Sequence, residues 1–94
     1  MKNYRSGSWH LLRISGPNDF ESEIMAVYQS SGRPADCEAY LQWEADSGDQ
    51  IFWLSPAASD LASRLPKYQL SLESAEPAGG ISAHPIFRKR SIFD

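Results

Sequence analysis

The sequence predicts an α+β fold, specifically a ferredoxin-like βαββαβ two-layer sandwich with a four-stranded antiparallel sheet and two short helices on one face. Three observations lead to this prediction. The chain is read as strand, helix, strand, strand, helix, strand, and a polar turn joins the two middle strands into a hairpin. Two of the strand-length segments, residues 39–45 and 68–73, also have one apolar face, as expected when helices cover only one side of a sheet.

A hairpin over residues 39–54 is the most sharply defined element. Apolar and polar residues alternate from Ala39 to Ala45, which is typical of a half-buried strand. The predicted core face of this strand consists of Ala39, Leu41, Trp43 and Ala45. Residues 46–49 have the composition of a tight turn, and residues 51–54 are apolar throughout, as in a strand that is covered on both faces.

The first part of the chain predicts a leader, a strand and a helix. Residues 1–8 are polar and are expected to be flexible. Residues 9–15 are a strand candidate that a Gly-Pro pair ends. Asn18 is a predicted helix N-cap, and Glu21 completes a capping-box pattern. The helix that follows has one apolar stripe, made by Phe20, Ile24, Val27 and Tyr28.

The second part predicts a short helix, a last strand and a tail. Ser55 is an N-cap, and Pro56 occupies the first helical position, where its missing N–H is no loss. Residues 68–73 alternate as a strand whose inward residues are Tyr68, Leu70 and Leu72. Residues 77–94 contain prolines and adjacent glycines and are predicted to be a C-terminal tail, so the single folded domain is expected to span residues 9–76.

Composition indicates a small globular domain in a reducing compartment. The 94 residues are 41% hydrophobic and 12% aromatic, which favours a folded core over disorder. A lone Cys37 cannot form an intramolecular disulfide, and no cluster of Cys and His suggests zinc. The N-terminus lacks a signal peptide and no apolar run is long enough to cross a bilayer, so the predicted location is the cytoplasm, without a membrane partner.

The net charge of −3 conceals an uneven distribution of charged residues. Residues 16–62 contain nine acidic residues and one basic residue, whereas both ends of the chain are basic. The predicted solvent face of the first hairpin strand forms an acidic ridge that consists of Glu38, Tyr40, Gln42, Glu44 and Asp46, continued by Asp49. Such a ridge is either a solvated strand edge, which charges protect from further pairing, or a recognition surface for a basic protein.

The aromatic residues raise an alternative function. The open sheet face would present Tyr40 with either Trp53 or Phe52, and a second copy, the tail or a ligand would have to cover it. A small-ligand or cofactor-free enzyme domain would place a pocket between the sheet and the helices. The candidate lining residues of this pocket are Trp9, His10, Trp43 and Trp53, together with Tyr40.

The sequence contains no motif for catalysis, a metal or a cofactor. No nucleophile motif surrounds a serine or Cys37. The carboxylates fall at capping or solvent-facing positions rather than in a buried pair. An acidic strand would also repel phosphate. We therefore expect no catalytic residue, no metal, no cofactor and no nucleic-acid partner.

Residues 86–93 combine apolar pairs with a basic triplet. They form either a docked end or an exposed peptide that exchanges between subunits or binds a partner, and the residues that would dock are Phe87, Arg88, Lys89, Arg90 and Phe93. The triplet would complement the acidic ridge of another copy. The preferred hypothesis is a small non-enzymatic interaction module of bacterial or phage type, which binds a basic protein or itself as a homodimer.

Overall fold

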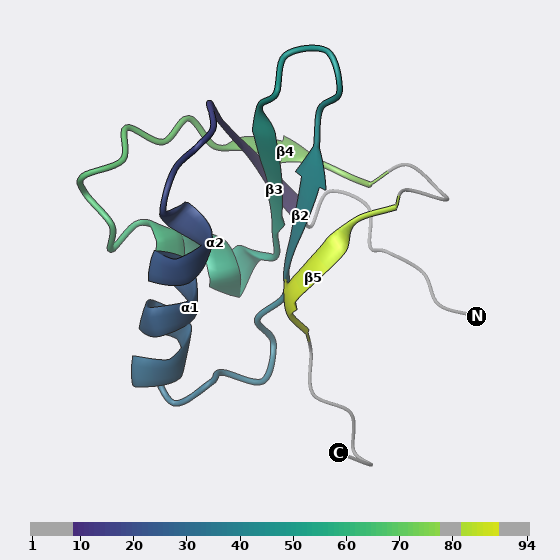
Figure 1. The fold of residues 1–94 in the computed structure, drawn as a ribbon. Coiled ribbons are helices and arrows are strands. Elements are labelled where there is room, and N and C mark those ends of the chain that lie inside the picture. Colours follow the sequence, from purple (N-terminus) through teal and green to yellow (C-terminus); the bar gives the residue numbers. More distant parts are fainter. Residues whose placement is uncertain (1–8, 78–81, 89–94) are drawn as a thin grey trace.

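The computed structural model describes residues 9–77 and 82–88 of the chain (Figure 1). These residues contain five strands and two helices: β1 (Trp9–Ile14), α1 (Phe20–Ser30), β2 (Ala39–Trp43), β3 (Gln50–Leu54), α2 (Pro56–Ala62), β4 (Glu73–Ala75) and β5 (His84–Phe87). The predicted α+β class is confirmed. The predicted flexible leader, residues 1–8, lies outside the described residues.

The strands form one antiparallel sheet in the order β4-β1-β3-β2-β5. Both helices lie on the same side of this sheet (Figure 1). The predicted four-stranded ferredoxin-like sandwich is wrong, because a fifth strand extends the sheet beyond β2. This strand comes from residues 84–87, which the sequence had suggested were part of a tail.

Strand β5 joins the sheet because it pairs with β2 and packs against α1. Ala39 pairs with Phe87 and Leu41 pairs with His84, with an irregularity between the two pairs. The Phe87 side chain is only 6% exposed, and its ring stacks on that of Tyr28 in α1, with centroids 4.0 Å apart and planes 2° from parallel. Burial of this aromatic pair stabilises the pairing of β5 with β2. Pro85 lacks a backbone N–H, so β5 can occupy only an edge of the sheet.

The last predicted strand is shorter, and begins later, than expected. Strand β4 covers only Glu73–Ala75 and pairs with β1 at the opposite edge of the sheet. Residues 68–72 form no strand. Their apolar side chains are nevertheless partly buried against the main core, as predicted for Tyr68, Leu70 and Leu72. A loop can bury alternate residues as a strand does. The alternation in residues 68–73 therefore predicted correctly which side chains are buried, but not whether the backbone pairs with another strand.

Both helices begin close to their predicted positions. The side chain of Ser55, the N-cap of α2, accepts a 3.3 Å hydrogen bond from the Ala58 N–H. Helix α1 begins at Phe20, so its N-cap is Asp19 rather than the predicted Asn18. The Asn18 side chain still accepts a 2.8 Å hydrogen bond from the Phe20 N–H. Local capping signals therefore located both helix starts to within one residue.

The hydrophobic core has two parts, one on each face of the sheet. The larger part lies between the sheet and the helices, and its fully buried side chains include Leu12, Phe20, Ile24, Phe52 and Leu54. The smaller part, here called the second cluster, consists of Trp9, Ile51 and Trp53, with Leu11, Tyr40 and Ala75 packed against them. Of the two residues considered for the sheet face without helices, Trp53 lies there, whereas Phe52 lies in the main core.

Candidate binding surface around Trp43

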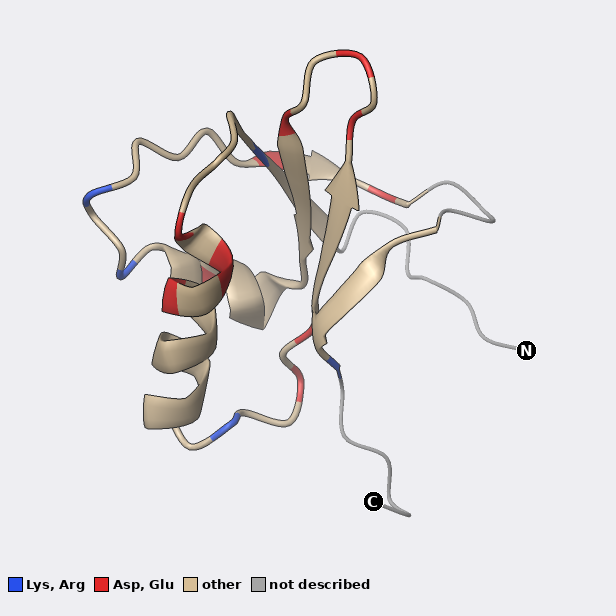
Figure 2. Cartoon of the chain, viewed as in Figure 1, with Lys and Arg blue, Asp and Glu red and all other residues tan. Residues whose placement is uncertain are grey.

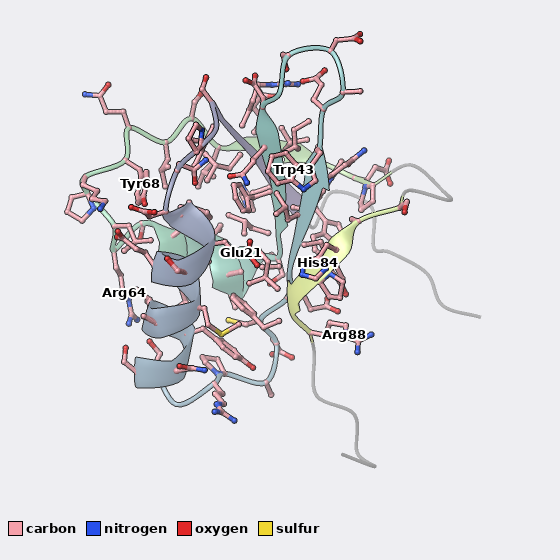
Figure 3. All side chains as sticks on the ribbon, viewed as in Figure 1. Glu21, Trp43, Arg64, Tyr68, His84 and Arg88 are labelled. Carbon is pink, nitrogen blue, oxygen red and sulfur yellow. The ribbon has the colours of Figure 1, made fainter. Side chains whose placement is uncertain are left out.

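Trp43 is the last residue of β2, and its side chain is 61% exposed. No other large hydrophobic side chain is exposed among the described residues. Trp43 shares a face of the strand with Ala39 and Leu41, which are buried, and the sequence therefore predicted that it belongs to the core. The helices cover only the first part of this face, and Trp43 lies beyond the N-terminal end of α1 (Figure 3).

The start of α1 lies beside Trp43. Gln50 pairs with Trp43 across the hairpin, and its buried side chain accepts a 2.6 Å hydrogen bond from the side-chain amide of Asn18. Because neighbouring strands are about 4.8 Å apart, this bond holds the start of α1 about one strand away from Trp43. An open depression of about 340 Å³ follows this part of the helix and is lined by Asn18, Asp19, Glu21, Ser22 and Met25.

Acidic residues lie on the two elements next to Trp43, the hairpin and the start of α1. Figure 2 shows them on the hairpin and at the start of α1, and Figure 3 shows Trp43 on the same side of the molecule. They are Asp19 and Glu21 from the start of α1, and Glu44, Asp46 and Asp49 from the hairpin. These five residues together with Trp43 are called the Trp43 surface below.

Arg13 neutralises part of this negative charge. Its guanidinium forms an ion pair with Glu44 and a second one, at 3.7 Å, with Asp49. The other three carboxylates of the Trp43 surface take part in no ion pair among the residues that the structure describes. Five carboxylates against one guanidinium leave the surface with a clear negative charge.

The predicted acidic ridge is divided in the structure. The Tyr40 ring lies 5.8 Å from that of Trp9, and the Gln42 side chain accepts a 2.8 Å hydrogen bond from the Trp53 indole, so both residues pack against the second cluster. Glu38 is half-buried just before β2 and accepts a 3.5 Å hydrogen bond from the Tyr40 hydroxyl. The remaining three ridge residues belong to the Trp43 surface. Strand β5 covers the outer edge of β2 at residues 39–41, so only the first part of the ridge lies within the β2–β5 pairing.

The four predicted pocket residues are divided between the two faces of the sheet. Trp9 and Trp53 are buried in the second cluster, on the face without helices. His10 alternates with Trp9 along β1 and points to the helix side, as Trp43 does from β2. The structure therefore does not bring these side chains together around one ligand.

The structure describes two of the predicted tail-docking residues. Phe87 is buried in the main core, and Arg88 is exposed directly after β5 (Figure 3). The other three, Lys89, Arg90 and Phe93, lie outside the described residues.

The described residues contain one cysteine, and it is not exposed. Cys37 is fully buried, and the burial, together with the negative charges of Asp36 and Asp60, raises the pKa of its thiol, which lowers its reactivity. Within residues 9–77 and 82–88, no group of three or more His, Cys, Asp or Glu side chains could hold a metal ion. The same residues include no helix with the length and apolar character needed to cross a membrane.

No protein-family model, curated protein or solved structure shows significant similarity to this chain.

The contribution of α1 to the Trp43 surface was not predicted. The acidic residues near its start had been assigned to the helix dipole, and no local pattern shows that they face the end of the hairpin. His84 was also missed as a neighbour of Trp43: it pairs with Leu41 and so lies diagonally across from Trp43 on the same face. The sequence did contain a signal for the exposure of Trp43. The residue lies at the end of a strand, next to a polar turn, and a short helix packed on the sheet does not have to extend over that end.

Proposed function

We propose that this protein is a non-enzymatic interaction module that binds a basic protein segment on the Trp43 surface. The observation that carries the proposal is the 61% exposure of Trp43 among five carboxylates. Tryptophan has a large apolar area that gains free energy when a partner covers it, and aromatic residues are enriched in protein interfaces for this reason. The single cysteine fits a function in the reducing cytoplasm.

The chemistry of the surface selects a partner by its charge. A guanidinium or ammonium group over an exposed indole ring gains about 0.5–1 kcal/mol. The carboxylates add a field that attracts a basic partner and accelerates its association. The same field repels a phosphate backbone, so the partner we propose is a protein rather than a nucleic acid. A surface this small and open supports weak binding, in the micromolar to millimolar range.

The alternative function, a small-ligand or cofactor-free enzyme domain, has less support. Its expected lining residues lie on two faces of the sheet. The depression beside α1 is open and is lined mainly by polar side chains. A ligand site is usually enclosed and largely apolar, and it buries most of the surface of its ligand. The described depression therefore does not favour this alternative.

Titration with short peptides, followed by Trp fluorescence and NMR, tests the proposal. A peptide of alternating arginine and glycine should bind at low ionic strength, shift the indole resonance of Trp43, and dissociate as salt is added. The same peptide with glutamate in place of arginine should not bind. Binding that persists unchanged in Trp43→Ala would refute the proposed surface.

Two substitutions of one kind provide a matched control for the electrostatic part. Glu21→Gln removes a carboxylate of the Trp43 surface and should weaken binding of the arginine peptide. Glu73→Gln removes an exposed carboxylate from β4, at the edge of the sheet three strands away from β2, and should leave binding unchanged. Equal effects of the two substitutions would show that only the net charge of the protein matters.

A further inference from the structure

We infer that the partner is a second copy of this chain, and that the basic segment 88–90 of each copy binds the Trp43 surface of the other. The inference rests on the proposed function and identifies its partner. The segment consists of Arg88, Lys89 and Arg90 and lies between two apolar pairs, Ile86-Phe87 and Ile92-Phe93. One short stretch thus supplies the cations and the apolar side chains that an acidic surface with an exposed indole would bind.

The strand register places Arg88, the start of this segment, far from the Trp43 of its own copy. Phe87 pairs with Ala39, at the opposite end of β2 from Trp43. At about 3.3 Å per residue, the length of β2 separates these positions by about 13 Å. Strand β5 is antiparallel to β2 and runs away from Trp43, so Arg88 is farther still (Figure 3). A contact within one copy would require the segment to reverse its direction along β5.

A contact between two copies requires no such reversal. A two-fold axis can pair each basic segment with the Trp43 surface of the other copy, and this symmetric dimer contains the contact twice. Once the first contact has formed, the second becomes intramolecular, so two individually weak contacts suffice for a stable dimer.

Arg88 is available for such a contact. It is exposed and takes part in no ion pair among the described residues. Other bases of the last third of the chain are engaged within the fold: Lys67 pairs with Glu23 at 2.5 Å, and Arg64 donates a 2.9 Å hydrogen bond to the Ser31 hydroxyl. The negative Trp43 surface and the basic segment are therefore complementary in charge, and we expect them to meet between copies.

Sedimentation velocity on the full chain at low ionic strength tests the inference. The wild type should dimerise as its concentration rises. Trp43→Ala, and separately the double variant Arg88→Gln/Arg90→Gln, should each raise the dimer dissociation constant about a hundredfold, because either change removes both contacts of a symmetric dimer. The control, Arg33→Gln/Arg64→Gln, removes the same charge from exposed positions outside the Trp43 surface and should dimerise like the wild type.

A mixture of the two defective variants separates direct pairing from misfolding. Trp43→Ala retains an intact basic segment, and Arg88→Gln/Arg90→Gln retains an intact Trp43 surface. Native mass spectrometry of the mixture should therefore detect a heterodimer, held by one contact, that neither variant forms alone. A mixture that stays as monomeric as its components would reject the pairing of this segment with this surface.

The remaining outcomes distinguish the inference from the proposed function. A wild type that is monomeric at every concentration, yet binds the arginine peptide at Trp43, would reject the second copy as the partner and keep the proposed function. A monomer that does not bind the peptide would reject both. A dimer that both variants leave unchanged would show that the copies associate through a different surface.

Discussion

Truncation of Phe87 tests whether β5 is an integral part of the fold. The Phe87 side chain is 6% exposed, and its ring centroid lies 4.0 Å from that of Tyr28. Phe87 also pairs with Ala39 and so joins β5 to β2. Replacement of a buried Phe by Ala costs about 3–5 kcal/mol, and since an edge strand can relax around the cavity we expect about 3 kcal/mol for Phe87→Ala. In a domain of this size each kcal/mol lowers Tm by about 4–8 °C, so the expected decrease is about 12–24 °C.

Thermal unfolding followed by circular dichroism measures this decrease. The control is Trp43→Ala at a protein concentration low enough to keep the chain monomeric; it removes a larger side chain from an exposed position and should change the free energy of unfolding by no more than about 0.5 kcal/mol. If Phe87→Ala unfolded at the same temperature as Trp43→Ala, β5 would contribute nothing to stability. The five-stranded sheet would then not describe the protein in solution.

Further outcomes are expected at Arg13, Asn18 and Cys37. Arg13→Gln should tighten binding of the arginine peptide, because it frees two hairpin carboxylates, and should lower stability by less than about 1 kcal/mol, since exposed ion pairs contribute little; weaker peptide binding would contradict this. Asn18→Ala should lower the free energy of unfolding in urea by about 1–2 kcal/mol, because it removes hydrogen bonds to the first turn of α1 and to the buried Gln50. Because burial raises the pKa of the Cys37 thiol, Ellman's reagent should label the folded protein much more slowly than the unfolded one; equal rates would contradict the burial. The unfolded thiol ionises first, so Tm should fall as pH rises above about 8.5, and Cys37→Ala should reduce this fall.

The elements predicted well from the sequence are those that depend on neighbouring residues. The hairpin turn has Gly48 at a φ of 76°, a conformation that glycine adopts without strain. The start of α2 depends on Ser55 and the residues that follow it directly. Each signal lies within a few residues of the structure that it determines, and no tertiary contact is needed to interpret it.

Strand β5 could not be predicted in this way. Its pairing joins Ala39 to Phe87, which are far apart in the sequence, and its burial depends on the Tyr28 ring of α1. The local composition, with a proline inside the strand and glycines before it, indicates a loop. Long-range packing therefore overrides the local signal at β5. The proximity of α1 to the hairpin end at Trp43 also depends on residues far apart in the sequence, and it could not be predicted for the same reason.

The three tryptophans of the sheet differ in what a partner could gain from covering them. Trp9 and Trp53 are 4% and 8% exposed, although they lie on the face without helices. Tyr40 packs against this pair, and Gln42 accepts the hydrogen bond of the Trp53 indole. A partner on that face would therefore gain little further burial from these indoles. Trp43 is 61% exposed, and since full burial of a large apolar side chain contributes about 1.5–3 kcal/mol, a partner that covers it would recover much of that amount. A partner would therefore bury less additional apolar area on the acidic strand face, which the sequence suggested as the interface, than at the end of the hairpin. There the exposed indole and the carboxylates of the Trp43 surface lie together.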